Sequence, residues 1–194
     1  MKKHNFIIGS LASLFLLFSL FITGCKKEEQ VVSPPLPGNE FLTTVKLELV
    51  NTVTNDTVIG IWRDLTPEDT NPADTSLALL NLKENSTYKA TIFLLDETKN
   101  PAEDITTEIK ERGNYHQLFY FPSPNLGANL VVNVTDTDTN SPPLPLGITT
   151  NFITNAAAIG KVNVILRHQP NVKNGTFAPG STDIDVNFQV NISN

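Results

Sequence analysis

Residues 184–192 constrain the fold of this chain more than any other segment. Every second residue there is apolar, and polar residues fill the positions between. The apolar residues are Ile184, Val186, Phe188, Val190 and Ile192. Such alternation is typical of a β-strand that has one face buried and the other in water. Because a single strand cannot bury its own apolar face, this segment predicts a sheet packed against a second layer, with Phe188 in the core.

Eight further segments have the alternation or composition of short strands. They cover residues 43–49, 57–62, 77–82, 87–95, 115–121, 130–135, 147–153 and 161–168. Turn dipeptides such as Asn174-Gly175 and Pro179-Gly180 lie between the segments. The sequence therefore predicts an all-β fold: an antiparallel β-sandwich of about nine strands, immunoglobulin-like in the loose sense.

One segment, residues 101–112, predicts a short helix. Pro101 suits the first turn, and the acidic residues that follow it suit the positive end of the helix dipole. Arg112 followed by glycine suits the helix end. Ile105 and Ile109 are four residues apart, so we expect both to face the sheet.

The overall composition excludes several classes of protein. Of 194 residues, 40% are hydrophobic and 18% charged, which is enough apolar material for a core. Asp and Glu number 20 against 14 Lys and Arg, and a nucleic-acid binder needs clustered basic residues instead. The single cysteine excludes an internal disulfide framework and a cysteine-rich zinc module.

The N-terminus has the pattern of an export signal. Lys2 and Lys3 precede an uncharged, apolar stretch over residues 6–22, and Thr23-Gly24-Cys25 follows. A membrane-spanning anchor is the alternative, but a small residue before Cys25 resembles the bacterial lipobox, in which the cysteine sulfur carries lipid. We therefore predict a signal peptide over residues 1–24 and acylation of Cys25, with palmitate as a typical acyl chain.

Residues 25–40 predict a tether between the lipid and the sandwich at residues 41–194. Lys26-Lys27-Glu28-Glu29 resembles the export signal of Bacteroidetes surface lipoproteins, and the alternative is an ordinary solvated linker. Prolines at 34, 35 and 37 favour an extended chain. We expect an outer-membrane lipoprotein, and the sequence leaves open whether it lies on the cell surface or the periplasmic face.

The sequence contains no pattern typical of a catalytic nucleophile, so we expect no enzyme. It lacks a Gly-x-Ser-x-Gly motif, and we assign its only cysteine to lipid. His116 and His168 are the two histidines after the signal peptide. His116 is explained as a strand histidine with a satisfied ring nitrogen, and His168 as a polar residue on the rim at a strand end. The alternative is a metal or ligand contact, for His116 together with Glu108 or Glu111.

Asp136, Asp138 and Asn140 space three oxygen-bearing side chains at alternate positions. Calcium takes six to eight oxygens, so these residues are a candidate weak calcium site, the only cofactor that we expect. Ser141-Pro142 and the missing bidentate Glu exclude an EF-hand. The alternative is a solvated turn. A weaker candidate of the same kind lies in the acidic loop of Asp64, Glu68 and Asp69.

Several phrases of the sequence resemble a group of poorly characterised Bacteroidetes lipoproteins, often encoded beside TonB-dependent outer-membrane receptors. The phrases include Ala102-Glu103-Asp104-Ile105-Thr106, His116-Gln117-Leu118-Phe119-Tyr120, Leu166-Arg167-His168-Gln169-Pro170, and Gly175-Thr176-Phe177 through Asp183-Ile184-Asp185-Val186. The resemblance extends from about residue 41 to the C-terminus. It implies a β-sandwich lipoprotein with an accessory role in nutrient capture, and it implies no established binding residues.

Two functions are consistent with these features. The first is a lipid-anchored, non-enzymatic binding module of the cell envelope, accessory to an outer-membrane receptor, whose loops contact a ligand. Trp62 and the aromatic residues of 115–121 are candidate contacts. The alternative is a structural envelope lipoprotein that binds no small ligand. In either case we expect the membrane as a partner through the N-terminal lipid and no nucleic acid, and the binding module would have an outer-membrane receptor as a further partner.

Overall fold

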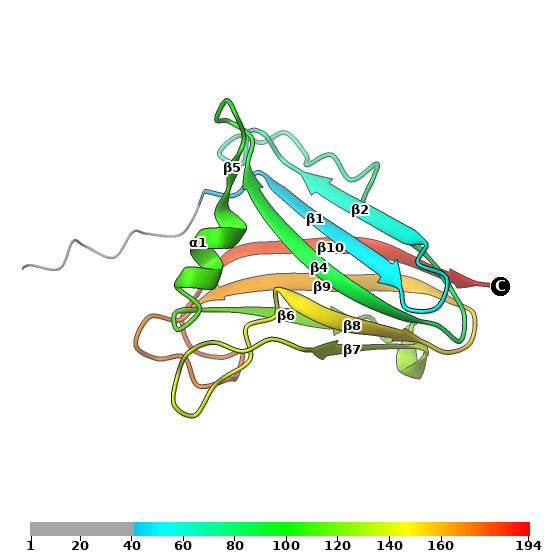
Figure 1. The fold of residues 1–194 in the computed structure, drawn as a ribbon. Helices are drawn as coiled ribbons and strands as arrows, with labels where there is room; N and C mark the ends of the chain where they lie inside the picture. Colours follow the sequence, from blue (N-terminus) through cyan, green and yellow to red (C-terminus); the bar gives the residue numbers. More distant parts are fainter. Residues whose placement is uncertain (1–40) are drawn as a thin grey trace, which may run out of the picture. The chain divides into compact units, whose positions relative to one another are not determined.

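The computed structural model describes residues 41–194. The predicted signal peptide at residues 1–24, the acylated Cys25 and the tether at 25–40 lie outside the described residues. The described part is built from two facing β-sheets and a short helix (Figure 1), which confirms the predicted all-β sandwich.

The first sheet has the strand order β2-β1-β4-β8-β7, and β5 pairs with β4. Its strands are β1 (Thr44–Asn51), β2 (Thr57–Arg63), β4 (Thr87–Asp96), β5 (Glu103–Asp104), β7 (Leu130–Val134) and β8 (Thr149–Thr154). The second sheet has the order β3-β10-β9-β6. Its strands are β3 (Leu79–Lys83), β6 (His116–Pro122), β9 (Ala158–His168) and β10 (Ser181–Ser193). All the predicted strands are present, with ends shifted by a few residues.

One strand pair departs from the predicted antiparallel arrangement, because β3 runs parallel to β10. These two strands lie far apart in the sequence, and no hairpin connects them. Turn geometry therefore does not dictate their relative direction, as it does for strands joined by a tight turn. The remaining neighbours in both sheets are antiparallel.

The core lies between the two sheets and follows the predicted alternation. Phe188 is 0% exposed, and the other apolar residues of residues 184–192 are buried with it. Side chains from the first sheet, such as Phe152 and Leu47, are equally buried opposite them. The prediction that this face of the last strand points inward is therefore confirmed.

The helix α1 (Ile105–Glu111) is shorter than predicted. Glu103 and Asp104 pair with β4 instead of forming the first helical turn, so the predicted start at Pro101 is wrong. Asp104 is the N-cap residue, and its side chain accepts a hydrogen bond from the Thr106 amide at 2.9 Å. Ile105 and Ile109 are buried as predicted. A 3-10 turn, η1 (Gly127–Asn129), precedes β7.

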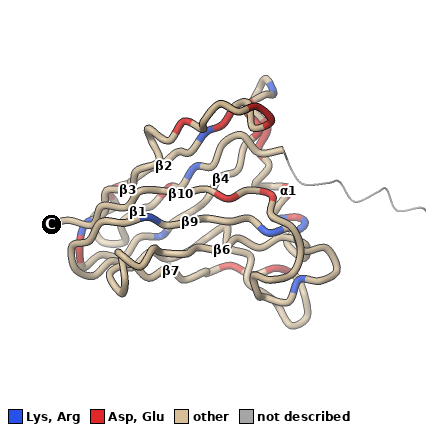
Figure 2. The backbone as a smooth tube through the Cα atoms, turned by 180° about the vertical axis from the view of Figure 1, so that it is seen from behind, with Lys and Arg blue, Asp and Glu red and all other residues tan. Residues whose placement is uncertain are grey.

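Two surface properties follow from the described residues. Lys and Arg are interspersed with Asp and Glu along the chain (Figure 2), so residues 41–194 lack the basic stripe typical of nucleic-acid binders. Within the same range, no helix has the length and apolar character needed to span a bilayer.

Candidate metal centre

His116 and His168 lie side by side on the inner face of the second sheet. His116 begins β6 and His168 ends β9, and the two residues are directly opposite each other in the antiparallel pairing. Opposite residues place their side chains on the same face of a sheet. That face is the buried one, because His116 is 0% exposed and His168 5% exposed. Strand register thus brings together two histidines that are 52 residues apart in the sequence.

Asp183 joins the histidines because of a β-bulge in β10. Ile184 points into the core, so regular alternation would point Asp183 outward. The register of β10 with β9 shifts between Thr182 and Ile184, which makes Asp183 the extra residue. A bulge re-aims a side chain in this way. The side chain of Asp183 is 0% exposed, so it is buried with the two imidazoles.

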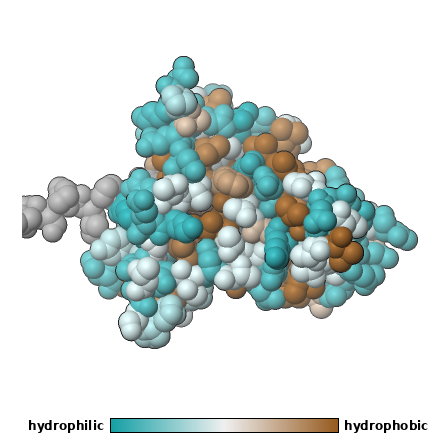
Figure 3. All heavy atoms as spheres, in the orientation of Figure 1, coloured by the Kyte–Doolittle hydropathy of each residue, from teal (hydrophilic) through white to brown (hydrophobic). Residues whose placement is uncertain are grey.

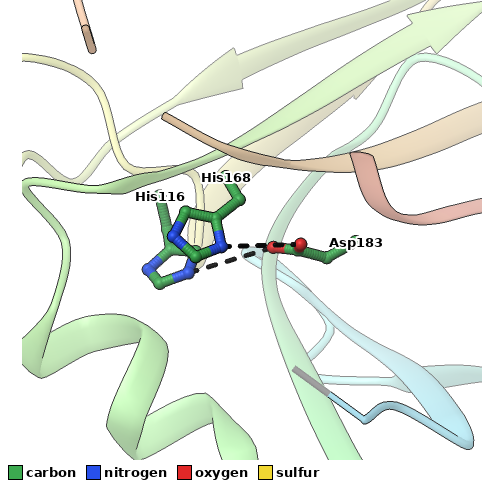
Figure 4. A group of neighbouring side chains, drawn as sticks. All are labelled: His116, His168 and Asp183. Carbon is green, nitrogen blue, oxygen red and sulfur yellow. Dashed lines mark ion pairs between the residues drawn. The ribbon is translucent and has the colours of Figure 1, made fainter. Parts of the chain in front are cut away.

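Figure 4 shows both imidazole rings directed at the Asp183 carboxylate. His116 Nε2 lies 3.9 Å from Asp183 Oδ2, and His168 Nδ1 lies 3.7 Å from Asp183 Oδ1. The ring centroids are 4.8 Å apart, with an angle of 45° between the planes. One donor atom from each residue lies within 4.8 Å of the other two. We call these three residues the His–His–Asp centre.

The hydrogen bond at the other ring nitrogen of His116 determines which tautomer the neutral ring adopts. His116 Nδ1 lies 3.1 Å from the backbone oxygen of Arg112. A carbonyl oxygen only accepts hydrogen bonds, so Nδ1 carries the proton and donates it. In the neutral ring, Nε2 then has the lone pair on the side facing Asp183. Histidines that bind metals typically donate their second ring N–H to a backbone carbonyl or carboxylate in this way.

The three residues fit a divalent transition-metal ion of the zinc class. Two imidazoles and one carboxylate form a common protein ligand set for zinc and for non-haem iron. With metal–ligand distances near 2.1 Å, tetrahedral ligand atoms lie about 3.4 Å apart. The two nitrogen–oxygen separations, 3.7 and 3.9 Å, exceed that value by a few tenths of an ångström, and the three donor atoms lie within 4.8 Å of one another. Binding would require the side chains to move inward, and it would leave the fourth coordination position to another ligand.

A second buried polar cluster contains the predicted calcium-binding residue Asp138. Asp138 Oδ2 accepts a hydrogen bond from Lys173 Nζ at 2.7 Å, and Lys173 Nζ also donates to the Gly113 carbonyl at 2.9 Å. Asp138 Oδ1 accepts from the backbone amides of Asn140 and Leu144 at 3.0 and 2.8 Å. The side chains of Lys173 and Asp138 are 1% and 0% exposed. We call this group the Lys173–Asp138 pair.

Burial and hydrogen bonds act in opposite directions on the ionisation of this pair. Burial disfavours the charged form of Asp138, but hydrogen bonds from the Leu144 amide, Lys173 and the Asn140 amide outweigh burial. The pKa of Asp138 therefore lies below its ordinary value. Burial lowers the pKa of Lys173, and the neighbouring carboxylate of Asp138 partly offsets this effect.

The other predicted calcium ligands also have protein partners. Asp136 accepts hydrogen bonds from the Gly147 and Ile148 amides at 2.8 and 3.1 Å. Asn140 Nδ2 donates to Asp138 Oδ2 at 2.7 Å. Calcium binding at this loop stays a prediction, and these contacts show that the ion would have to displace Lys173 from Asp138.

The acidic loop at residues 64–69 is exposed and has the hydrogen bonds of ordinary turns. Asp64 accepts from the Thr66 amide at 3.1 Å. Asp69 accepts from the amide and side chain of Asn71, both at 2.6 Å. Glu68 is exposed beside them. This arrangement fits the solvated turn that the sequence left as an alternative.

The carboxylate partner of the histidines differs from the predicted one. Glu108 Oε1 pairs with Arg112 Nη1 at 2.8 Å, and Glu111 is exposed. Neither belongs to the His–His–Asp centre, and Asp183 takes the place that the sequence assigned to them. A usable signal for Asp183 was present: the turn dipeptides within residues 169–180 predict a hairpin, which places the start of the last strand near His168.

The predicted aromatic contacts divide between the surface and the core. Phe119 and Phe121 lie on the outer side of β6. The Phe177 ring packs edge-on against both, with its ring centroid 5.3 Å from that of Phe119 and 5.5 Å from that of Phe121. Tyr120 points inward and packs edge-on against Phe152. Trp62 is partly buried against the core. Apolar side chains reach the surface shown in Figure 3 as small groups among polar ones.

No family model matches this chain, and searches of curated proteins and of solved structures found no match either. The resemblance to Bacteroidetes lipoproteins therefore stays a prediction.

Proposed function

We propose that this protein is a lipid-anchored binding module of the cell envelope that holds a divalent transition-metal ion in its His–His–Asp centre. One observation carries the proposal: strand register and a β-bulge direct two imidazoles and a carboxylate toward one another inside the sandwich. A bulge interrupts a strand that is otherwise regular, and bulges are frequent beside functional sites.

The chemistry of the donors supports a transition metal over calcium or magnesium. Imidazole nitrogens suit zinc, iron, copper and nickel, whereas calcium and magnesium prefer oxygen ligands. Three protein ligands leave a fourth coordination position, as in catalytic zinc sites. The three side chains are at most 6% exposed, so a substrate has no open path to that position, and their burial supports the holding of an ion over turnover of a substrate. The proposal therefore remains one of binding and not of catalysis.

The sequence supports the location in the envelope. Residues 1–24, Cys25 and the tether at 25–40 have the pattern of an exported lipoprotein, and the resemblance described above suggests an outer-membrane receptor as partner. A metal-binding module tethered beside such a receptor would serve nutrient capture. The alternative function is a structural envelope protein without a small ligand. Metal binding distinguishes the two functions, because a structural protein needs no metal.

A cobalt titration tests the proposed centre. Cobalt(II) replaces zinc in many sites and absorbs visible light when nitrogen and oxygen ligands surround it. We expect the chain purified in detergent to bind one cobalt ion, with a visible absorption band that zinc abolishes. Asp183→Asn should remove the band, because it removes the carboxylate ligand. Asp185→Asn is the matched control, since Asp185 lies on the same strand but is exposed. An unmodified chain that shows no band would favour the structural alternative.

Acylation is tested at Cys25. We expect Cys25→Ala to prevent labelling by a palmitate analogue and to release the protein from the membrane fraction. Labelling of the Cys25→Ala variant would contradict the lipid anchor.

If Lys27-Glu28-Glu29 direct the protein to the cell surface, replacing these three residues by alanines should protect it from protease added to intact cells.

A further inference from the structure

The His–His–Asp centre is closed, so an ion can enter or leave only if a covering segment moves. Its side chains are at most 6% exposed. Residues 169–180 connect β9 to β10, beginning directly after His168 and ending three residues before Asp183. We call this segment the β9–β10 loop. Because two of the three ligands lie next to its ends, opening of the loop would separate them.

The β9–β10 loop is held together by its own hydrogen bonds. Gln169 Nε2 donates to the carbonyls of Thr176 and Pro179, each at 2.9 Å. Arg167 Nη2 donates to the Gly180 carbonyl at 2.6 Å. Gly180 packs so closely on the backbone of His168 that any Cβ would clash with the His168 carbonyl. The loop would therefore move as a unit, and the backbone of His168, one of the three proposed metal ligands, would move with it.

Lys173 connects this unit to the element that carries the third ligand. Its ammonium reaches Asp138, and it also reaches the Gly113 carbonyl, three residues before His116. Uncharged contacts join the loop to the same region. Phe177 packs edge-on against Phe119 and Phe121 of β6, the Gln169 amide donates to the Tyr115 carbonyl, and Gln117 Nε2 lies 3.5 Å from the Gly175 carbonyl. One buried ammonium thus ties the loop between His168 and Asp183 to the turn before His116.

We propose that Lys173 is a latch that holds the β9–β10 loop closed and thereby controls how fast the centre takes up and releases its ion. The inference rests on the proposed function, since it concerns the metal of that centre. Lys173 does not touch the ion; it is a positioning residue that acts through the loop. When the Lys173–Asp138 pair is intact, opening of the loop requires the separation of two buried charges, which is costly. Without the pair, the loop opens more often, as weakly held segments do.

The test measures the rate of metal release with and without the pair. The full chain is loaded with one equivalent of cobalt(II), an excess of a chelator is added, and loss of the visible band is followed. Lys173→Met alone leaves Asp138 buried without its cation and endangers the fold. The double variant Lys173→Met/Asp138→Leu removes both charges and fills their space with apolar side chains, a change that proteins often tolerate. It also removes the acceptor of the Asn140 and Leu144 amides, so its fold is checked alongside its release rate. We expect release from the double variant to be faster by on the order of 10-fold, with the fold intact by circular dichroism.

An exposed ion pair at the other end of the sandwich provides the control. Lys83 Nζ and Asp56 Oδ2 are 3.1 Å apart, and both side chains are largely exposed. Lys83→Met/Asp56→Leu should release cobalt at the rate of the unmodified chain. Equal release rates for the unmodified chain and the Lys173→Met/Asp138→Leu variant would overturn the latch while leaving the metal centre in place. An unmodified chain that takes up no cobalt would overturn the proposed function and the latch together.

Discussion

Asp138 and Asp183 are both aspartates with completely buried side chains, but their surroundings differ in kind. Asp138 faces the Lys173 ammonium at 2.7 Å, and its two oxygens accept hydrogen bonds at 2.7 to 3.0 Å. Asp183 faces the nitrogens of two imidazoles at 3.7 and 3.9 Å. The first set of distances is that of direct hydrogen bonds, and the second approaches the spacing of ligands around a metal ion.

The Lys173–Asp138 pair contains a cation that the chain itself supplies, whereas we propose that the His–His–Asp centre binds a metal ion. The Lys173–Asp138 pair offsets a buried negative charge with a lysine from the same chain. The His–His–Asp centre combines nitrogen and oxygen donors, a set that suits a transition metal. Four predictions test whether the two aspartates differ in this way.

The largest effect is expected when Lys173 is replaced alone. Lys173→Met leaves Asp138 as a buried charge without its partner, so we expect the free energy of unfolding to fall by about 3–5 kcal/mol. Adding Asp138→Leu should restore part of this loss, because no charge then remains buried, although the Asn140 and Leu144 amides lose the oxygen that accepts their hydrogen bonds. Urea unfolding of both variants measures the two effects. A single variant as stable as the unmodified chain would mean that the pair contributes little.

Addition of metal should stabilise the other cluster. Zinc at one hundred times its dissociation constant should raise the free energy of unfolding by about 2.7 kcal/mol, because the ion binds only the folded chain. His168→Ala should abolish the increase, whereas Lys173→Met/Asp138→Leu should retain it. The measurement is urea unfolding with and without zinc. Equal stabilisation of the His168→Ala variant would place the ion elsewhere.

Acid should weaken the Asp138 cluster in a defined pH range. The pKa of Asp138 is below its ordinary value, so the folded state binds fewer protons than the unfolded state at acidic pH. The contribution of Asp138 is therefore complete above about pH 4 and is lost as pH falls through its pKa in the folded state. In metal-free protein, the stability of Asp138→Asn should depend less on pH between about pH 2 and 5. Parallel pH profiles for both proteins would contradict this account.

The smallest effect is expected from calcium. A site of about 10⁻⁴–10⁻³ M affinity would add at most about 1.4 kcal/mol of stability at millimolar calcium. Since calcium must compete with Lys173 for Asp138, we expect a larger rise in Tm for Lys173→Met than for the unmodified chain. Asp136→Asn/Asp138→Asn should show no rise. If neither the unmodified chain nor Lys173→Met responds to calcium, the loop is an ordinary polar turn.

Local pattern was sufficient for the fold but not for the whole site. Alternation along residues 184–192 correctly predicted that Phe188 is buried, because a strand with one buried face repeats every two residues. Extending the same alternation by one residue would place Asp183 outside, since a bulge adds one residue without any mark in the sequence. His116 and His168 were recognisable as candidates by residue type. Their opposition across β6 and β9 depends on strand pairing, which no local pattern specifies.

The partner of Asp138 could not be predicted for a similar reason. Asp138 and Lys173 are 35 residues apart in two irregular loops. Spacing alone singled out the oxygen-bearing side chains at residues 136–140 but not the Lys173 ammonium that contacts Asp138. The sequence therefore indicated a cation beside Asp138, whereas the structure shows that a lysine of the same chain lies there.

Anomalous X-ray diffraction can show directly whether the His–His–Asp centre binds a transition-metal ion. Crystals of the chain grown with equimolar zinc would be measured on both sides of the zinc absorption edge. We expect one strong anomalous peak between His116, His168 and Asp183, about 2.1 Å from one donor atom of each. A map with no peak at this position, or with zinc only at surface residues, would contradict it.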